Sequence, residues 1–108
     1  MTKIDKLKEA IKSIKKITFS KHFQEKAIIR GITEEEIQLC LGNPENIVQF
    51  EYQGKEPEGQ KYALIFNKSN KYDIKIVISV KEDLNVVTAH IQSKKKRKVL
   101  DKWLKMQK

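Results

Sequence analysis

The fold class of this chain is decided by the stretch DIKIVISV at residues 73–80. Apolar residues at positions 74, 76, 78 and 80 alternate with positions 73, 75, 77 and 79, and this period of two is typical of a β-strand. Similar alternation occurs around residues 48–52, 62–66 and 85–92. The segments between these runs are short and turn-like, so the sequence predicts four strands in a consecutive antiparallel meander.

The residues before position 46 follow a helical period instead. Residues 3–16 place apolar side chains three or four positions apart among lysines, which predicts an amphipathic first helix. Ser20 is a favourable N-cap and Gly31 a favourable end for a second helix over residues 21–30. Phe23, Ala27 and Ile28 are expected to form its apolar stripe.

A third and a fourth helix are also expected. Thr33 and Glu36 form a capping box, and the helix that it starts ends at Gly42-Asn43-Pro44. A helical pattern returns over residues 95–107, where Trp103 is expected to fold back onto the domain. A chain of 108 residues is the size of one domain. The sequence therefore predicts a single α+β domain over residues 1–108, with N-terminal helices packed on a four-stranded antiparallel sheet and a C-terminal helix.

The positive charge is concentrated at the two ends of the chain. Residues 1–16 carry six lysines against two acidic residues, and residues 94–108 carry eight basic residues against one. The segment between them has nine basic and eleven acidic residues, although the whole chain has a formal charge of +9. Such asymmetry is typical of proteins that contact phosphate. A Lys-rich and Ile-rich composition is also expected from an AT-rich genome or from adaptation to heat.

Composition excludes several classes of protein. The longest uncharged apolar run, residues 76–80, is far shorter than the roughly 20 residues that cross a membrane, so no membrane partner is expected. Cys40 is the single cysteine, and with two histidines it cannot build a repeated zinc motif. We therefore expect a cytoplasmic protein with neither a structural metal nor a cofactor.

Three polar residues could act together on the second helix. His22, Lys26 and Arg30 are spaced at i, i+4 and i+8, which predicts one exposed row about 12 Å long. An imidazole that moves a proton and two cations that stabilise a phosphate are what metal-independent RNA cleavage requires. The residues alone leave three interpretations open: a solvated surface, a phosphate-binding site and a catalytic site.

A second candidate lies where the last strand ends. Alternation places Val87, Ala89 and Ile91 on one face and His90 on the other, so His90 is either an exposed or structural residue or an acid, base or ligand. A basic run follows it, which is either a solvated helix start or a nucleic-acid contact. The run consists of Lys94, Lys95, Lys96, Arg97 and Lys98.

Several short segments carry a family resemblance. They are Phe19-Ser20-Lys21-His22, Lys26, Arg30-Gly31-Ile32-Thr33, Ile37, Asn43-Pro44 and Val86-Val87-Thr88-Ala89. Together they resemble the signature of small prokaryotic domains grouped with the RelE/ParE toxin superfamily, in which His, Arg and Arg-Gly-Ile follow at fixed spacing. The resemblance covers residues 18–92. Lys26 stands where that family usually has Arg, which keeps the charge but loses bidentate contact with phosphate.

The resemblance implies a compact toxin-like fold related to RNA endonucleases. It implies roles for His22, Lys26, Arg30 and His90 in catalysis, with Thr88 beside them. Three classes of function are then expected from the sequence: a metal-independent ribonuclease toxin, a non-catalytic module that binds nucleic acid or the ribosome, and a protein-interaction domain. The corresponding partners are RNA or the ribosome and, for a toxin, a small acidic antitoxin.

Overall fold

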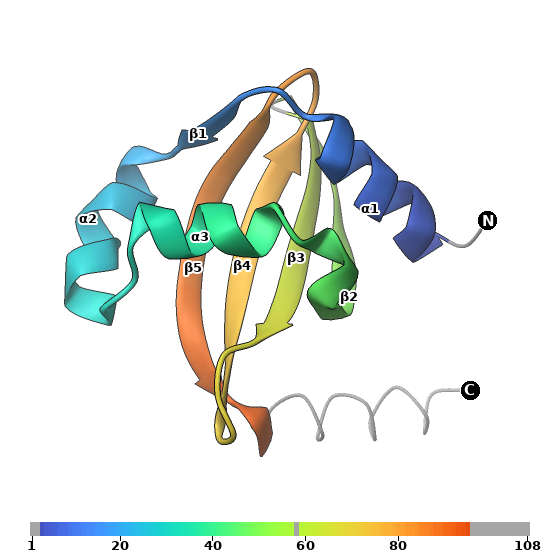
Figure 1. Ribbon diagram of the computed structural model, residues 1–108. Helices are drawn as coiled ribbons and strands as arrows, with labels where there is room; N and C mark the ends of the chain where they lie inside the picture. The colour runs from blue at the N-terminus through green and yellow to red at the C-terminus, as the bar shows by residue number, and fades with distance from the viewer. Residues whose placement is uncertain (1–2, 58, 96–108) are drawn as a thin grey trace.

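The computed structural model describes residues 3–57 and 59–95, which form helices and one sheet (Figure 1). The helices are α1 (Lys3–Ser13), α2 (Lys21–Arg30), α3 (Glu34–Leu41) and the short 3-10 helix η1 (Pro44–Asn46). The strands are β1 (Ile17–Phe19), β2 (Ile47–Glu56), β3 (Gly59–Asn67), β4 (Tyr72–Val80) and β5 (Leu84–Ser93).

The sheet has five strands in the order β1-β5-β4-β3-β2. Strands β2 to β5 pair antiparallel in chain order, whereas β1 pairs parallel with β5, with Ile17 opposite Leu84 and Phe19 opposite Val86. The expectation of a four-stranded, purely antiparallel sheet is therefore wrong. Three residues are too few to show a period of two, and only the tertiary contact with β5 makes them a strand.

The helices cover one face and one edge of the sheet. Figure 1 shows α1 and α3 lying across the same face of the sheet, while α2 lies beside β5, at the same edge as β1. The core between these layers buries Phe23 from α2, Ile37 from α3 and Leu64 from β3, each at most 1% exposed. Burial of such large apolar side chains is the main stabilising contribution to folding.

Local signals position α2 and α3 as the sequence predicts. The Ser20 side chain accepts a hydrogen bond from the Phe23 amide at 3.0 Å, and Gly31 ends α2 in a left-handed conformation with φ of 69°. The predicted apolar stripe of α2 is wrong at Ile28, which is 89% exposed. Residue 28 lies 100° around the helix from Ala27, and this rotation carries it away from the sheet. Helix α1 ends at Ser13, three residues before the predicted end.

Strand β5 contains a bulge that changes which side chains face the core. Thr88 pairs with Val77 and Val86 with Ile78, so Val87 is an extra residue in the ladder. Val86 and Ala89 are therefore both buried in the core, and the predicted grouping of Val87 with Ala89 is wrong. The expected C-terminal helix falls mainly on residues 96–108, outside the described part of the chain.

Candidate nucleic-acid interface

Arg30 joins the end of α2 to β5. Its Nη1 atom donates one hydrogen bond to Thr88 Oγ1 and another to the Ala89 carbonyl oxygen, both at 3.0 Å. Ser20, at the start of α2, donates from its hydroxyl to the Val87 carbonyl at 2.5 Å. Strand β1 pairs only with residues 84–86, so α2 takes the place of a neighbouring strand along the next part of β5.

The predicted row on α2 is only partly exposed. His22 and Lys26 are exposed, but Arg30 is half-buried because its side chain turns onto β5. The structure thus brings two distant parts of the sequence together, because Ser20 and Arg30 contact Val87 and Thr88, 67 and 58 residues further along the chain.

His90 lies one residue beyond the Arg30 contact. It is half-buried and sits opposite Lys75 in the pairing of β4 with β5. After the bulge, period-two alternation puts His90 and Lys75 on the face opposite Ala89. The predicted orientation of His90 relative to Ala89 and Ile91 therefore agrees with the strand pairing, and Lys75 is a neighbouring cation that sequence reasoning missed.

Three lysines gather at the end of the sheet. Lys71 precedes β4, Lys94 and Lys95 follow β5, and all three line a shallow hollow together with Tyr72. The Lys94 amide donates to the Lys71 carbonyl at 3.0 Å, which extends the ladder and fixes these side chains near one another. We call Lys71, Lys94 and Lys95 the sheet-end lysines. The remaining predicted contacts, Lys96, Arg97 and Lys98, lie outside the described residues.

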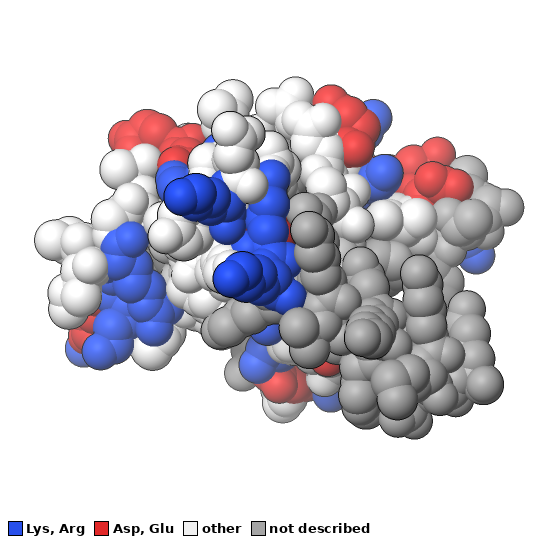
Figure 2. Space-filling view, turned by 90° about the horizontal axis from the view of Figure 1, so that it is seen from below, with Lys and Arg blue, Asp and Glu red and all other residues white. Residues whose placement is uncertain are grey.

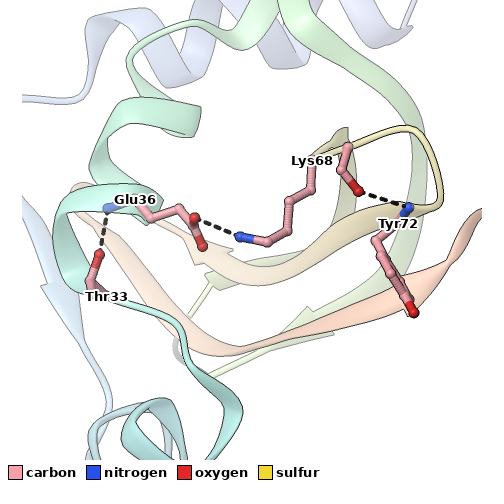
Figure 3. A network of polar contacts seen from close by, with 5 residues as sticks. Thr33, Glu36, Lys68 and Tyr72 are labelled. Atoms are coloured by element: carbon pink, nitrogen blue, oxygen red, sulfur yellow. Dashed lines mark hydrogen bonds and ion pairs between the residues drawn. The ribbon is translucent and has the colours of Figure 1, made fainter.

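A polar network ties the turn before the sheet-end lysines to α3. Figure 3 shows Lys68 reaching from the β3–β4 turn to Glu36, with Nζ and Oε2 2.8 Å apart. Thr33 accepts from the Glu36 amide at 3.1 Å, and the Ser69 hydroxyl accepts from the Tyr72 amide at 3.3 Å. The charge of Lys68 is thus neutralised, while its contact restricts the turn that carries Lys71.

The exposed cations of α2 are Lys21 and Lys26, and they form a second basic group beside that of the sheet-end lysines. Figure 2, which looks at the end of the sheet, shows basic side chains gathered over α2 and over the ends of the central strands. Between described residues, ion pairs join Lys12 to Glu45, Lys61 to Glu56 and Lys68 to Glu36. Within that part of the chain, no carboxylate pairs with the α2 cations or the sheet-end lysines, so their charges remain available to an anion.

The described residues give little support for a metal site or for a reactive thiol. Among residues 3–57 and 59–95, no three His, Cys, Asp or Glu side chains are grouped as metal ligands. Burial, followed by the nearby Glu36 carboxylate, raises the pKa of the Cys40 thiol. A raised pKa keeps this cysteine protonated and poorly nucleophilic.

Lys71 was also missed from the sequence. It stands in a turn, and turn lysines are ordinarily solvated, so only the pairing of β4 with β5 reveals that it meets Lys94. The signal in the sequence that could have located Lys71 is the predicted meander, because a meander brings the start of one strand beside the end of the next.

No helix in the described residues has the length and apolar character needed to cross a bilayer.

Comparison with known proteins places the chain in a family. Neither the curated proteins nor the solved structures include a match to this chain. Residues 19–91, well over half of the sequence and the part that contains α2 and β5, match the family described as Domain of unknown function (DUF4258). The chain therefore belongs to the DUF4258 family.

Proposed function

We propose that this protein binds RNA through the cations of α2 and the sheet-end lysines. The observation that carries the proposal is the gathering of Lys71, Lys94 and Lys95 at one end of the sheet, without a carboxylate partner in the described residues. Lysine ammonium groups act as point charges toward phosphate and release counterions when they bind. An RNA strand whose phosphate backbone passes across both cationic groups could contact the two of them at once.

The proposal is tested by the salt dependence of RNA affinity. The variant Lys71→Gln/Lys94→Gln/Lys95→Gln should weaken binding of a fluorescein-labelled single-stranded RNA, measured by fluorescence anisotropy at several salt concentrations. Each lost phosphate contact should reduce the slope of log K against log salt by about 0.7. The control Lys12→Gln/Lys15→Gln/Lys16→Gln removes the same charge from exposed positions in and after α1. Equal behaviour of the two variants would contradict the assigned surface.

A second candidate function, metal-independent RNA cleavage, is favoured by the contact of Arg30 with Thr88. This contact brings α2, with His22 and Lys26, to the strand that carries His90. In such a reaction a base removes the proton of the 2′-hydroxyl, the 2′ oxygen attacks phosphorus, and an acid protonates the departing 5′ oxygen. His22 and His90 are the candidates for base and acid, and Lys26 is the candidate for stabilising the phosphate.

Cleavage is tested separately from binding. End-labelled RNA incubated with the protein and EDTA should give fragments that end in a 2′,3′-cyclic phosphate, and His22→Ala or His90→Ala should abolish them. Expression of the chain should also arrest growth, with rescue by a small acidic antitoxin. Intact RNA at protein concentrations that saturate binding would leave a binding function without catalysis. Binding to isolated ribosomes but not to free RNA would identify the ribosome as the partner.

A further inference from the structure

A groove far along the sheet from the sheet-end lysines has no part in the proposed backbone contact. It has a volume of about 560 Å³ and lies between α1 and the strands β2, β3 and β4. Tyr52, Tyr62 and Phe50 supply aromatic walls, Leu7 supplies an aliphatic wall, and Lys6 and Lys81 stand at its margin. The described lining contains two cations and no carboxylate, so the groove suits a ligand that is both flat and anionic.

The two tyrosines form an ordered aromatic surface. Their ring centroids are 5.3 Å apart with an interplanar angle of 56°, and they are paired across the β2–β3 hairpin. The Tyr52 hydroxyl donates to Gln60 Oε1, which fixes the ring while 51% of the residue stays exposed. An exposed tyrosine held in this way loses little conformational freedom when another ring stacks on it.

We propose that this groove binds a nucleotide of single-stranded RNA, with the base stacked on Tyr52 and the adjoining phosphates near Lys6 and Lys81. Aromatic side chains beside a cationic track are the combination that recognises single strands, because every base offers a flat face. The Gln60 side chain accepts a hydrogen bond from Tyr52 through Oε1. Its amide nitrogen can therefore donate a hydrogen bond to a base in the groove. In a duplex the bases are stacked on one another and cannot reach the rings. An acidic peptide would use the lysines but would leave much of the aromatic wall without a matching surface.

This inference rests on the proposed RNA binding and adds the form of the RNA. The wild-type chain should prefer a single strand of about ten nucleotides over a duplex of the same sequence. Tyr52→Leu keeps the apolar volume but removes the aromatic face, and it should weaken single-strand binding by at least about fivefold. Tyr52→Phe removes only the hydroxyl and should retain the preference for single strands. Thermal unfolding of each variant shows whether the fold is intact.

Charge and position are tested with matched variants. Lys6→Gln/Lys81→Gln should weaken binding more than Lys15→Gln/Lys16→Gln, which removes two charges from exposed residues that do not line the groove. RNA that contains 5-iodouridine should form photo-crosslinks that map to the peptide carrying Tyr52 by mass spectrometry.

The outcomes separate the two proposals. Absence of any RNA binding by the wild type would overturn both. Binding that falls in the sheet-end triple variant but is unchanged in Tyr52→Leu would overturn the groove assignment alone. If Tyr52→Leu leaves RNA affinity unchanged but loses binding of an acidic peptide that contains aromatic residues, the groove is a peptide site and the nucleotide assignment is wrong.

Discussion

At the scale of single residues, Arg30 shows where sequence reasoning succeeds and where it stops. Helical spacing correctly places His22, Lys26 and Arg30 on successive turns of one helix. The same spacing could not show that Arg30 turns onto β5, because its acceptors, Thr88 and the Ala89 carbonyl, lie 58 and 59 residues away. A long side chain on a helix next to an open strand edge has two possible environments, and only tertiary structure selects one.

Arg30→Met should therefore destabilise the fold although it preserves much of the apolar stem. It removes two hydrogen bonds from a half-buried guanidinium, for which we expect a loss of about 1–2 kcal/mol in the free energy of unfolding. Lys26→Met, one turn earlier and exposed, should change that free energy by less than about 0.5 kcal/mol. Urea denaturation of both variants measures the difference. Equal losses at the two positions would show that the contacts with β5 contribute nothing to stability.

At the scale of elements, strong local signals were sufficient for two helices and the meander, but not for the edges of the sheet. The caps at Ser20 and Thr33 correctly predicted the starts of α2 and α3, because a cap is a contact within one turn. Strand β1 and the bulge at Val87 were not predictable in this way. Both depend on pairing between β5 and distant residues, which leaves no periodic trace in the sequence. The groove tyrosines were assigned to strands from the sequence, but their contact depends on the register of the hairpin.

The β2–β3 hairpin depends on a glycine at the start of β3. Gly59 has φ of +130°, and a Cβ atom there would lie 2.3 Å from the Val80 carbonyl oxygen, which is backbone and cannot move aside easily. We expect Gly59→Ala to lower the free energy of unfolding by more than about 2 kcal/mol. Gly54→Ala is the matched control, because Gly54 has φ of +108° but no atom within 4 Å of its Cβ position. Only backbone strain should affect that variant, at a cost of about 1 kcal/mol. Thermal or urea unfolding that ranks the two variants in the reverse order would contradict the close approach of β4.

At the scale of the whole molecule, charge and core are separated. The described core lies between the sheet and its helices, whereas the basic residues collect in the terminal segments and over one end of the sheet. The distribution of charge along the sequence was enough to predict the excess of basic residues in the terminal segments. It could not show that Lys71, from the middle of the chain, would lie beside Lys94 of the C-terminal segment, or that Lys75 would pair with His90.

Removing charge from the basic run should weaken RNA binding without unfolding the protein. Replacing Lys94, Lys95, Lys96 and Arg97 by Gln keeps the apolar residues that follow, and it should lower the salt slope by up to about 3. Deleting residues 94–108 removes all eight basic residues of this segment together with Trp103. Its effect on thermal stability therefore combines the loss of charge with the loss of apolar side chains, whereas the quadruple variant changes charge alone. A folded quadruple variant with unchanged affinity at low and high salt would favour a protein-interaction domain.

The parallel pairing of β1 with β5 also sets the time at which this protein can finish folding during its synthesis. Ile17 faces Leu84, so 67 residues must be added between the translation of one partner and that of the other. At about 5–20 residues per second, the ribosome needs roughly 3–13 s for this interval. During those seconds Ser20 and Arg30 lack their acceptors on β5, and Phe23 lacks the sheet that buries it. The N-terminal third of the nascent chain must therefore wait, with apolar surface open to chaperones, until almost the entire domain has been made.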